Sequence, residues 1–185
     1  GAWSANKSVT FNVSLAPHID GNFTASPNPV SKGQTLTLTA DNVVDDDGTV
    51  ASVSFYRDVD GDGLVTSVDK LLGTDSTSAD GFNLSIISSS TNLITGLNKL
   101  IAVAKDNKGV TSLPKLTTVT IDAPPTLSGF TASTNPSASA PITLSAKGST
   151  DINSMAFYLD TGDGVFNSTT DTLLGYGTYD SVAKS

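Results

Sequence analysis

The sequence predicts an all-β protein built from tandem β-sandwiches, and three observations support this prediction. The chain has 185 residues, and its 18 acidic residues are all Asp. It has no Glu, one Gln and one Met but 50 Ser and Thr, so strong helix formers are scarce and turn-forming residues are abundant. Short runs alternate apolar and polar residues, and no stretch of ten or more residues carries a helical stripe. Long segments also recur along the chain, which indicates repeated units.

The internal repeat defines the expected domain organisation. GNFTASPNP at 21–29 recurs as SGFTASTNP at 128–136, an offset of 107 residues. VSFYRDVDGDGLVTSVDKLLG from Val53 recurs as MAFYLDTGDGVFNSTTDTLLG from Met155, an offset of 102, because the later copy lacks residues around the acidic turn DDDG. A period near 105 residues matches a self-contained sandwich and exceeds a solenoid unit. We therefore predict three parts: 1–16 as the last strand of a preceding repeat, 17–123 as a complete sandwich, and 124–185 as the first part of a further repeat.

Short alternating strands follow one another within residues 17–123. Alternation in QTLTLTA and VASVSFYRD places five residues on the inward faces: Leu36, Leu38, Ala40, Val53 and Phe55. Further strands are expected in KLLGTD, GFNLSII, NKLIAVAKD and LTTVTI. Seven or so strands separated by Pro, Gly, Asn and Asp turns predict an immunoglobulin-like sandwich.

These motifs resemble a known family. The pattern F-T-A-S-P-N-P-V-x-x-G, then D-D-G-T-V-A-S-V-S-F-Y-R-D, then an Asp/Gly loop ending in D-x-L-L-G, is similar to bacterial immunoglobulin-like repeats. Such repeats occur in very large surface and secreted proteins, notably those of planctomycete type. The resemblance covers residues 17–177 and implies a stalk, spacer or adhesive array, although a shared fold does not by itself define a function.

The stretch RDVDGDGLVTSVDKLLG at 57–73 has the spacing of a calcium loop. Positions one, three, five, six, seven and twelve of the loop are Asp58, Asp60, Asp62, Gly63, Leu64 (through its carbonyl) and Asp69. Four carboxylates within twelve residues repel one another, and a divalent cation would remove that repulsion. The alternative is a hydrophilic hairpin loop whose Asp and Gly residues only make turns. We expect Ca²⁺ here, held weakly because the closing residue is Asp rather than the longer Glu.

A second loop carries a degraded version of this pattern. Asp160 and Asp171 keep the twelve-residue spacing, but Gly162 stands at position three and Asp163 comes one place early. Asn167 could add an oxygen ligand. The loop is either a rearranged cation site or a loop that binds no metal.

A third candidate site lies in two turns that we expect at the same end of the sandwich. One turn contains the acidic run Asp45, Asp46 and Asp47, and the other turn, KDNKG, contains Asp106. Such loops can gather Ca²⁺ near a domain junction. The alternative is two ordinary turns, which Lys105 and Lys108 beside Asp106 favour.

Composition and charge exclude several classes of function. A net charge of −8 and a pI near 4.3 argue against nucleic acid or an anionic membrane as a partner, since both need a basic face. The absence of Cys excludes disulfides and thiolate metal sites. No run approaches the roughly 18 apolar residues of a membrane span, and any export signal would have to lie outside this chain. His18 is the single His, with no nucleophile motif nearby, so we expect no enzyme.

The leading functional hypothesis is a structural or adhesive repeat segment of a large extracellular or cell-surface protein. Ca²⁺ would make its loop rigid, and its partners would be neighbouring repeats of the same or identical chains. A second hypothesis is a self-assembling subunit of a filament, sheath or surface layer that exchanges a strand around Phe11, Val13 and Leu15.

A third hypothesis is an accessory glycan-binding module of a secreted enzyme, with a surface polysaccharide or protein as its ligand. Such a module needs exposed aromatic side chains, whereas we expect Phe55, Phe82 and Phe130 to be core residues. The sequence therefore favours the structural hypothesis over this one.

Overall fold

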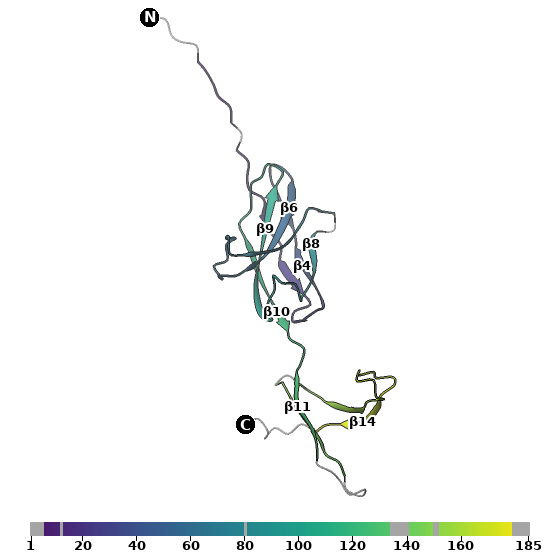
Figure 1. Cartoon of the computed structure of the whole chain (residues 1–185). Helices are drawn as coiled ribbons and strands as arrows, with labels where there is room; N and C mark the ends of the chain where they lie inside the picture. Colours follow the sequence, from purple (N-terminus) through teal and green to yellow (C-terminus); the bar gives the residue numbers. More distant parts are fainter. Residues whose placement is uncertain (1–5, 12, 80, 134–140, 150–151, 179–185) are drawn as a thin grey trace, which may run out of the picture. The chain divides into compact units, whose positions relative to one another are not determined.

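The computed structural model of the chain describes residues 6–11, 13–79, 81–133, 141–149 and 152–178. All helical or strand structure within these residues is β-strand, which confirms the predicted all-β class (Figure 1). The described residues include no helix long and apolar enough to cross a membrane. The chain divides into two compact units, Gly1–Ala123 and Pro124–Ser185, which we call unit 1 and unit 2 and describe separately.

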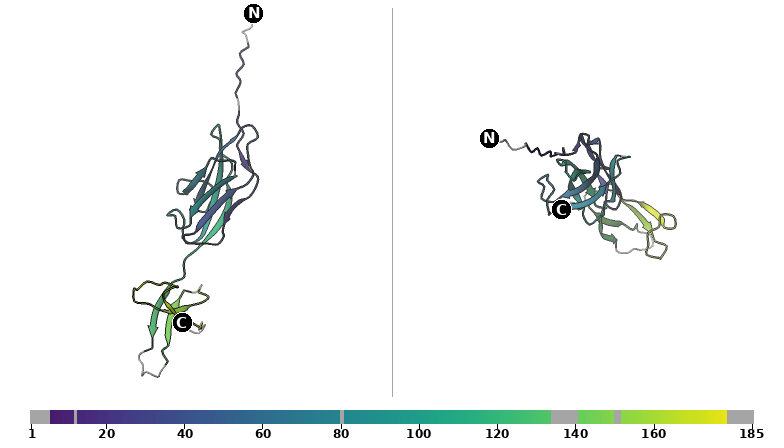
Figure 2. Two further views of the ribbon diagram at one scale, coloured as in Figure 1. Left: turned by 90° about the vertical axis from the view of Figure 1, so that its right-hand side faces the viewer. Right: turned by 90° about the horizontal axis from the view of Figure 1, so that it is seen from above.

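Unit 1 is a β-sandwich of two main sheets (Figure 2). The first sheet has the order β2-β4-β8, formed by Phe23–Ser26, Thr35–Ala40 and Phe82–Ile87. The second has the order β3-β10-β9-β6-β7, formed by Val30–Ser31, Lys115–Asp122, Gly96–Asp106, Val50–Asp58 and Lys70–Asp75. Strand β3 runs parallel to β10, whereas the other pairs in these sheets are antiparallel. A short third pair joins β1, His18–Ile19, to β5, Val43–Val44.

The core of unit 1 lies between the two main sheets. The five predicted inward-facing residues are confirmed as buried: Leu36, Leu38, Ala40, Val53 and Phe55. Phe82 is buried as predicted, and Phe23 of β2 packs against Phe55 of β6 with ring centroids 5.6 Å apart. Each fully buried aromatic or large aliphatic side chain contributes about 1.5–3 kcal/mol to stability. The Phe23–Phe55 contact therefore helps to hold the two sheets together.

The hairpin of β6 and β7 carries the acidic loop. Phe55 pairs with Gly73 and Tyr56 with Leu71, so Leu72 forms a bulge in β7. Gly73 faces the core so closely that an added Cβ would lie 2.7 Å from Leu84 Cδ1. Any larger side chain would displace Leu84, so glycine keeps the hairpin close to the opposite sheet.

Unit 2 contains two two-stranded sheets in its described residues. The first pairs β11, Leu127–Ala132, with β12, Leu144–Gly148, and the second pairs β13, Ala156–Leu159, with β14, Thr172–Tyr176. Phe157 pairs with Gly175 and Tyr158 with Leu173, so the second hairpin has its bulge at Leu174. The β13–β14 hairpin therefore repeats the β6–β7 hairpin, bulge included.

The prediction that Phe130 is a core residue is wrong, because its side chain is 66% exposed. Phe130 stacks on Phe157 with ring centroids 6.0 Å apart, as Phe23 packs on Phe55 in unit 1. In unit 1 that pair is enclosed by both main sheets, but the described residues of unit 2 contain no counterparts of β8, β9 and β10. Both rings of the pair are therefore buried in unit 1, whereas in unit 2 Phe130 is exposed and Phe157 is half-buried.

Residues 6–11 and 13–16 have no sheet partner within the described chain. Phe11, Val13 and Leu15 are 80%, 72% and 53% exposed. The assignment of 1–16 to a preceding repeat thus stays a prediction, since a strand forms only against a partner. Four ranges and two single positions of the predicted parts lie outside the described residues: 1–5, 12, 80, 134–140, 150–151 and 179–185.

Candidate metal centre

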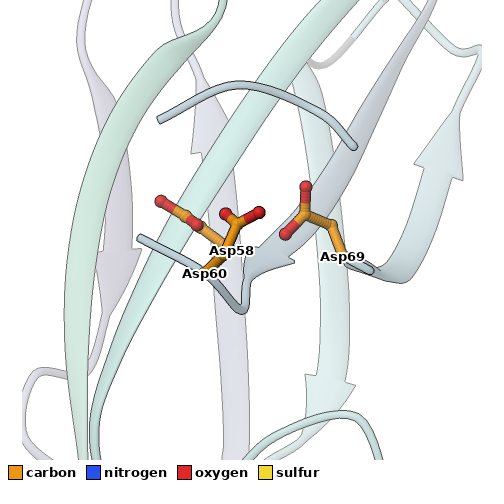
Figure 3. A group of neighbouring side chains, drawn as sticks. All are labelled: Asp58, Asp60 and Asp69. Atoms are coloured by element: carbon orange, nitrogen blue, oxygen red, sulfur yellow. The ribbon is translucent and has the colours of Figure 1, made fainter. Parts of the chain in front are cut away.

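Three carboxylates converge at the tip of the β6–β7 hairpin (Figure 3). Asp58 ends β6 and is 8% exposed, Asp69 directly precedes β7, and Asp60 lies in the loop between them. One carboxylate oxygen from each residue lies within 4.8 Å of the others. Arg57 pairs with Lys70, so the antiparallel register brings Asp58 and Asp69 side by side. Oxygen ligands in such a cluster suit hard cations such as Ca²⁺ or Mg²⁺.

Asp58 organises the first half of the loop. Its Oδ1 accepts the Gly61 N–H at 2.6 Å, and its Oδ2 accepts the Gly63 N–H at 3.1 Å. Both glycines have positive φ, +78° and +77°. Glycine reaches this left-handed conformation at no steric cost, so the G-D-G sequence lets the backbone turn toward Asp58.

Asp69 organises the second half of the loop. Its Oδ1 accepts the Val59 N–H at 2.8 Å, and its Oδ2 accepts the N–H and hydroxyl of Thr66 at 2.6 and 3.1 Å. Burial raises the pKa of Asp69, but these hydrogen bonds together outweigh it and hold the pKa below its ordinary value of 3.8. Asp69 is therefore ionised at neutral pH, as a cation ligand must be.

The structure places the other predicted ligands outside the cluster of three. Asp62 is exposed, and its Oδ1 accepts the Leu64 N–H at 2.8 Å. Leu64 itself is 56% exposed. The loop thus brings together three of the four carboxylates expected from the spacing.

Thr66 is a member of the site that the sequence analysis did not identify. Its hydroxyl lies 3.1 Å from Asp69 Oδ2 and 3.4 Å from Asp60 Oδ2, so a fourth side-chain oxygen lies beside the cluster. Thr66 is the ninth residue counted from Asp58, and position nine of a twelve-residue calcium loop commonly faces the ion. The position of Thr66 in the loop was therefore the sequence signal that could have identified it as a ligand.

Lys99 places a positive charge beside the loop. It lies on β9 directly opposite Asp58, and its Nζ donates to Gly61 O at 3.3 Å. The ammonium group ties the loop to the sheet and also repels a divalent cation in the cluster.

The loop of unit 2 has almost the same hydrogen-bond frame. Asp160 accepts the N–H groups of Gly162 and Gly164 at 2.9 and 3.0 Å, and both glycines again have positive φ. Asp171 accepts the N–H groups of Thr161 and Asn167 at 3.2 and 2.8 Å. These bonds align Gly162 with Gly61 of unit 1, so the position-by-position alignment used in the sequence analysis is corrected.

The corrected alignment shows which residue the second loop lacks. Asp163 accepts the Val165 N–H at 2.9 Å, just as Asp62 accepts the Leu64 N–H, so Asp163 corresponds to Asp62. The residue missing between Thr161 and Gly162 is therefore the counterpart of Asp60. One extra residue between Asn167 and Asp171 restores the twelve-residue length. Within the described residues, Asp160, Asp163 and Asp171 do not form a cluster like that of unit 1.

The third predicted group lies at the end of β6 where Val50 pairs with Asp106. Asp47 has Lys108 Nζ 3.3 Å from its Oδ2, and Asp106 is 2% exposed and accepts backbone N–H groups. Asp45 Oδ1 accepts the Asp47 N–H, whereas Asp46 is exposed. A lysine ammonium thus already accompanies this acidic group. His18, the single His, lies 3.5 Å from Asp20 Oδ2 in the segment entering the sandwich.

Comparisons with known proteins give no family for this chain. No protein-family model matches it, and no curated protein matches it. The resemblance to planctomycete-type repeats therefore stays a prediction.

Several solved structures are similar to this chain at low identity. The fibronectin(III)-like modules of Clostridium thermocellum CbhA share 16% identity at a TM-score of 0.43, over 60% of this chain and 50% of that one. A carbohydrate-binding module of the β-sandwich superfamily shares 19% identity at a TM-score of 0.42, and the match covers 72% of this chain and 54% of that one. Superoxide reductase (neelaredoxin) from Ignicoccus hospitalis shares 11% identity at a TM-score of 0.36, and the match covers 59% of this chain and 82% of that one. The chain spans about half the length of the first two, and the fold described above rests on its own strand pairing.

Proposed function

We propose that this chain is a non-enzymatic structural or adhesive segment of a larger extracellular or cell-surface protein, in which Ca²⁺ stiffens unit 1. The observation that carries the proposal is the convergence of Asp58, Asp60 and Asp69 at the tip of the β6–β7 hairpin. The internal repeat and the acidic composition support the structural role.

The donor set suits Ca²⁺ for three reasons. Its ligands are all oxygens, from three carboxylates and the nearby Thr66 hydroxyl, and Ca²⁺ prefers oxygen ligands. Hydrogen bonds from the loop backbone already hold Asp58 and Asp69, so little further ordering is needed on binding. Three like charges within 4.8 Å repel one another until a cation compensates them.

The expected effect of the ion is a stiffer hairpin. Asp58 and Asp69 flank the two strands, so a shared cation would link the end of β6 to the start of β7 and oppose their separation. We expect affinity in the range of extracellular modules, with a dissociation constant of about 10⁻⁴ to 10⁻³ M. At ten to a hundred times that constant, binding adds about 1.4–2.7 kcal/mol to stability.

Calorimetric titration and thermal unfolding with Ca²⁺ or a chelator test this proposal. Ca²⁺ should bind with one-to-one stoichiometry and raise the melting temperature of unit 1, and Asp60→Asn should abolish both effects. Asp46→Asn is the matched control. It also removes one exposed carboxylate, but Asp46 precedes the start of β6 and the cluster lies at the other end of that strand, so both effects should remain. A melting curve that neither Ca²⁺ nor chelator changes would refute the metal part of the proposal.

A second candidate function is assembly with neighbouring repeats of identical chains into a filament, sheath or surface layer. The observation that favours it is the exposed ring of Phe130, which stacks on the half-buried Phe157, whereas the counterpart pair Phe23–Phe55 is buried in unit 1. Sedimentation and electron microscopy of the purified protein test it, with assemblies expected for the parent chain and fewer for Phe130→Ser. The glycan-binding alternative gains less support, because the rings of Tyr158 and Phe166 are inclined at 63° and form no flat platform.

A further inference from the structure

Two turns meet at the end of unit 1 where β6 begins. Lys108 Nζ lies 3.3 Å from Asp47 Oδ2 and 3.2 Å from Asp47 O. The Asn107 N–H donates to Thr49 O at 3.0 Å. The turns at 45–48 and 106–109 are thereby joined by both side-chain and backbone contacts.

The same two turns hold the chain segment that precedes the sandwich. The Leu15 N–H donates to Asp47 Oδ2 at 3.3 Å, and the Ser14 hydroxyl donates to Asp106 Oδ2 at 3.1 Å. Pro17, two residues further on, is fully buried. The entering segment is therefore bound by two carboxylates before it reaches the sheet.

Both carboxylates are held in their ionised form. Burial raises the pKa of Asp106, but hydrogen bonds from the Val110 and Lys108 N–H groups and from Ser14 outweigh it, and the pKa falls below its ordinary value. The Leu15 N–H is the largest influence on Asp47 and lowers its pKa, with Lys108 acting in the same direction. Ionised carboxylates accept stronger hydrogen bonds than neutral groups do.

We propose that Asp47 and Asp106, with Lys108 as their counter-cation, form an interaction surface that binds the chain segment preceding the sandwich strands of unit 1 and fixes its direction of entry without a metal ion. The surface fits a segment in which a residue with a hydroxyl side chain is followed by a residue with a free backbone N–H, as Ser14 is followed by Leu15. A neighbouring repeat attached through this segment would inherit that direction.

Unit 2 supports the specificity of this surface. Its segment 149–154 is four residues shorter than the corresponding segment 43–52 of unit 1 and lacks the acidic turn. The start of unit 2 is held instead by two hydrogen bonds between Thr126 and Ser149. The Thr126 N–H donates to the Ser149 hydroxyl, and the Thr126 carbonyl accepts the Ser149 N–H. The surface is therefore a property of the acidic turn and not of the repeat in general.

Amide hydrogen exchange of Leu15, measured by NMR on the full chain, tests the proposal. In the parent protein this amide should exchange at least about tenfold more slowly than an unprotected one, and chelator should not change that rate. Asp47→Ala should abolish the protection, whereas Asp46→Ala, the matched control, should leave it intact. The Leu38 amide, in the middle strand β4, reports whether each variant is still folded.

Three results would overturn the proposal. The first is an unprotected Leu15 amide in the parent protein, and the second is protection that survives Asp47→Ala while Leu38 stays protected. The third is protection that disappears with chelator, which would show that a metal holds the segment. If Asp47→Ala unfolds the sandwich, Ser14→Ala replaces it, and unchanged Leu15 protection in that folded variant would equally contradict the proposal.

Discussion

The acidic loops of unit 1 and unit 2 share a hydrogen-bond frame and differ at two positions of the candidate site: unit 2 has no counterpart of Asp60, and it has Asn167 where unit 1 has Thr66. In both, the first carboxylate accepts two glycine N–H groups and the last one accepts N–H groups from the two halves of the loop. Only unit 1 has Asp60, and only unit 1 has a cluster of three carboxylates in the described residues. Hydrogen bonds therefore close both loops, and the candidate cation site of unit 1 is an addition to a loop that closes without it.

Deletion of Asp60 should have the largest effect, because it removes the carboxylate that the second loop lacks. We expect the affinity for Ca²⁺ to fall at least about a hundredfold, since one of three carboxylates is lost. Calorimetric titration measures the affinity. Stability in the presence of chelator should change by less than about 0.5 kcal/mol if the Asp58 and Asp69 hydrogen bonds persist. A large loss of metal-free stability would contradict the separation of frame and site.

Insertion of an Asp between Thr161 and Gly162 is the reverse experiment. It should create a second cation site in unit 2, because the frame carboxylates Asp160 and Asp171 are already in place. Titration should then show two sites per chain, the new one the weaker, because Asn167 stands where unit 1 has Thr66. Insertion of Asn at the same point is the control, and one site per chain in the Asp variant would refute the alignment.

Lys99→Met should strengthen the binding of Ca²⁺ by the loop of unit 1. It removes the ammonium beside Gly61, and a positive charge near a divalent cation lowers affinity. We expect the affinity for Ca²⁺ to rise about threefold to tenfold, with the difference shrinking at high salt. Lys70→Met, which removes an exposed lysine on β7, is a control for net charge. Unchanged affinity in Lys99→Met would show that the ammonium does not influence the site.

The smallest expected effect is the pH dependence that the two loop frames share. The pKa values of Asp69 and Asp160 both lie below 3.8, so each carboxylate stabilises the folded state above that pH and loses the contribution as pH falls through its folded pKa. An NMR titration of the side-chain carboxyl carbons in chelator should give values below 3.8 for both residues. Asp69→Asn should flatten the acid limb of the stability curve of unit 1.

The sequence predicted much of the candidate site but not its limits. The spacing of Asp58, Asp60 and Asp69 identified all three residues that converge. The same spacing also included Asp62, which accepts a hydrogen bond from its own loop and is exposed. Thr66 was missed because the spacing argument used the carboxylates and the carbonyl at position seven, but not the side chain at position nine. A linear count cannot show these differences, because backbone hydrogen bonds decide which side chains turn inward.

Residue patterns along the chain were enough to predict the longer strands β4 and β6 to β10, the repeat and the acidic hairpin loop, because a side-chain period of two and local turn chemistry depend only on neighbouring residues. The two-residue strands β1, β3 and β5 were not predicted. Tertiary structure alone decided which groups meet across the fold. Lys108 meets Asp47 across 61 residues, and Asp106 meets Ser14 across 92. It also decided that Phe23 and Phe55 are buried while Phe130 is exposed, because burial depends on whether further strands cover a face and not on the residues that form it.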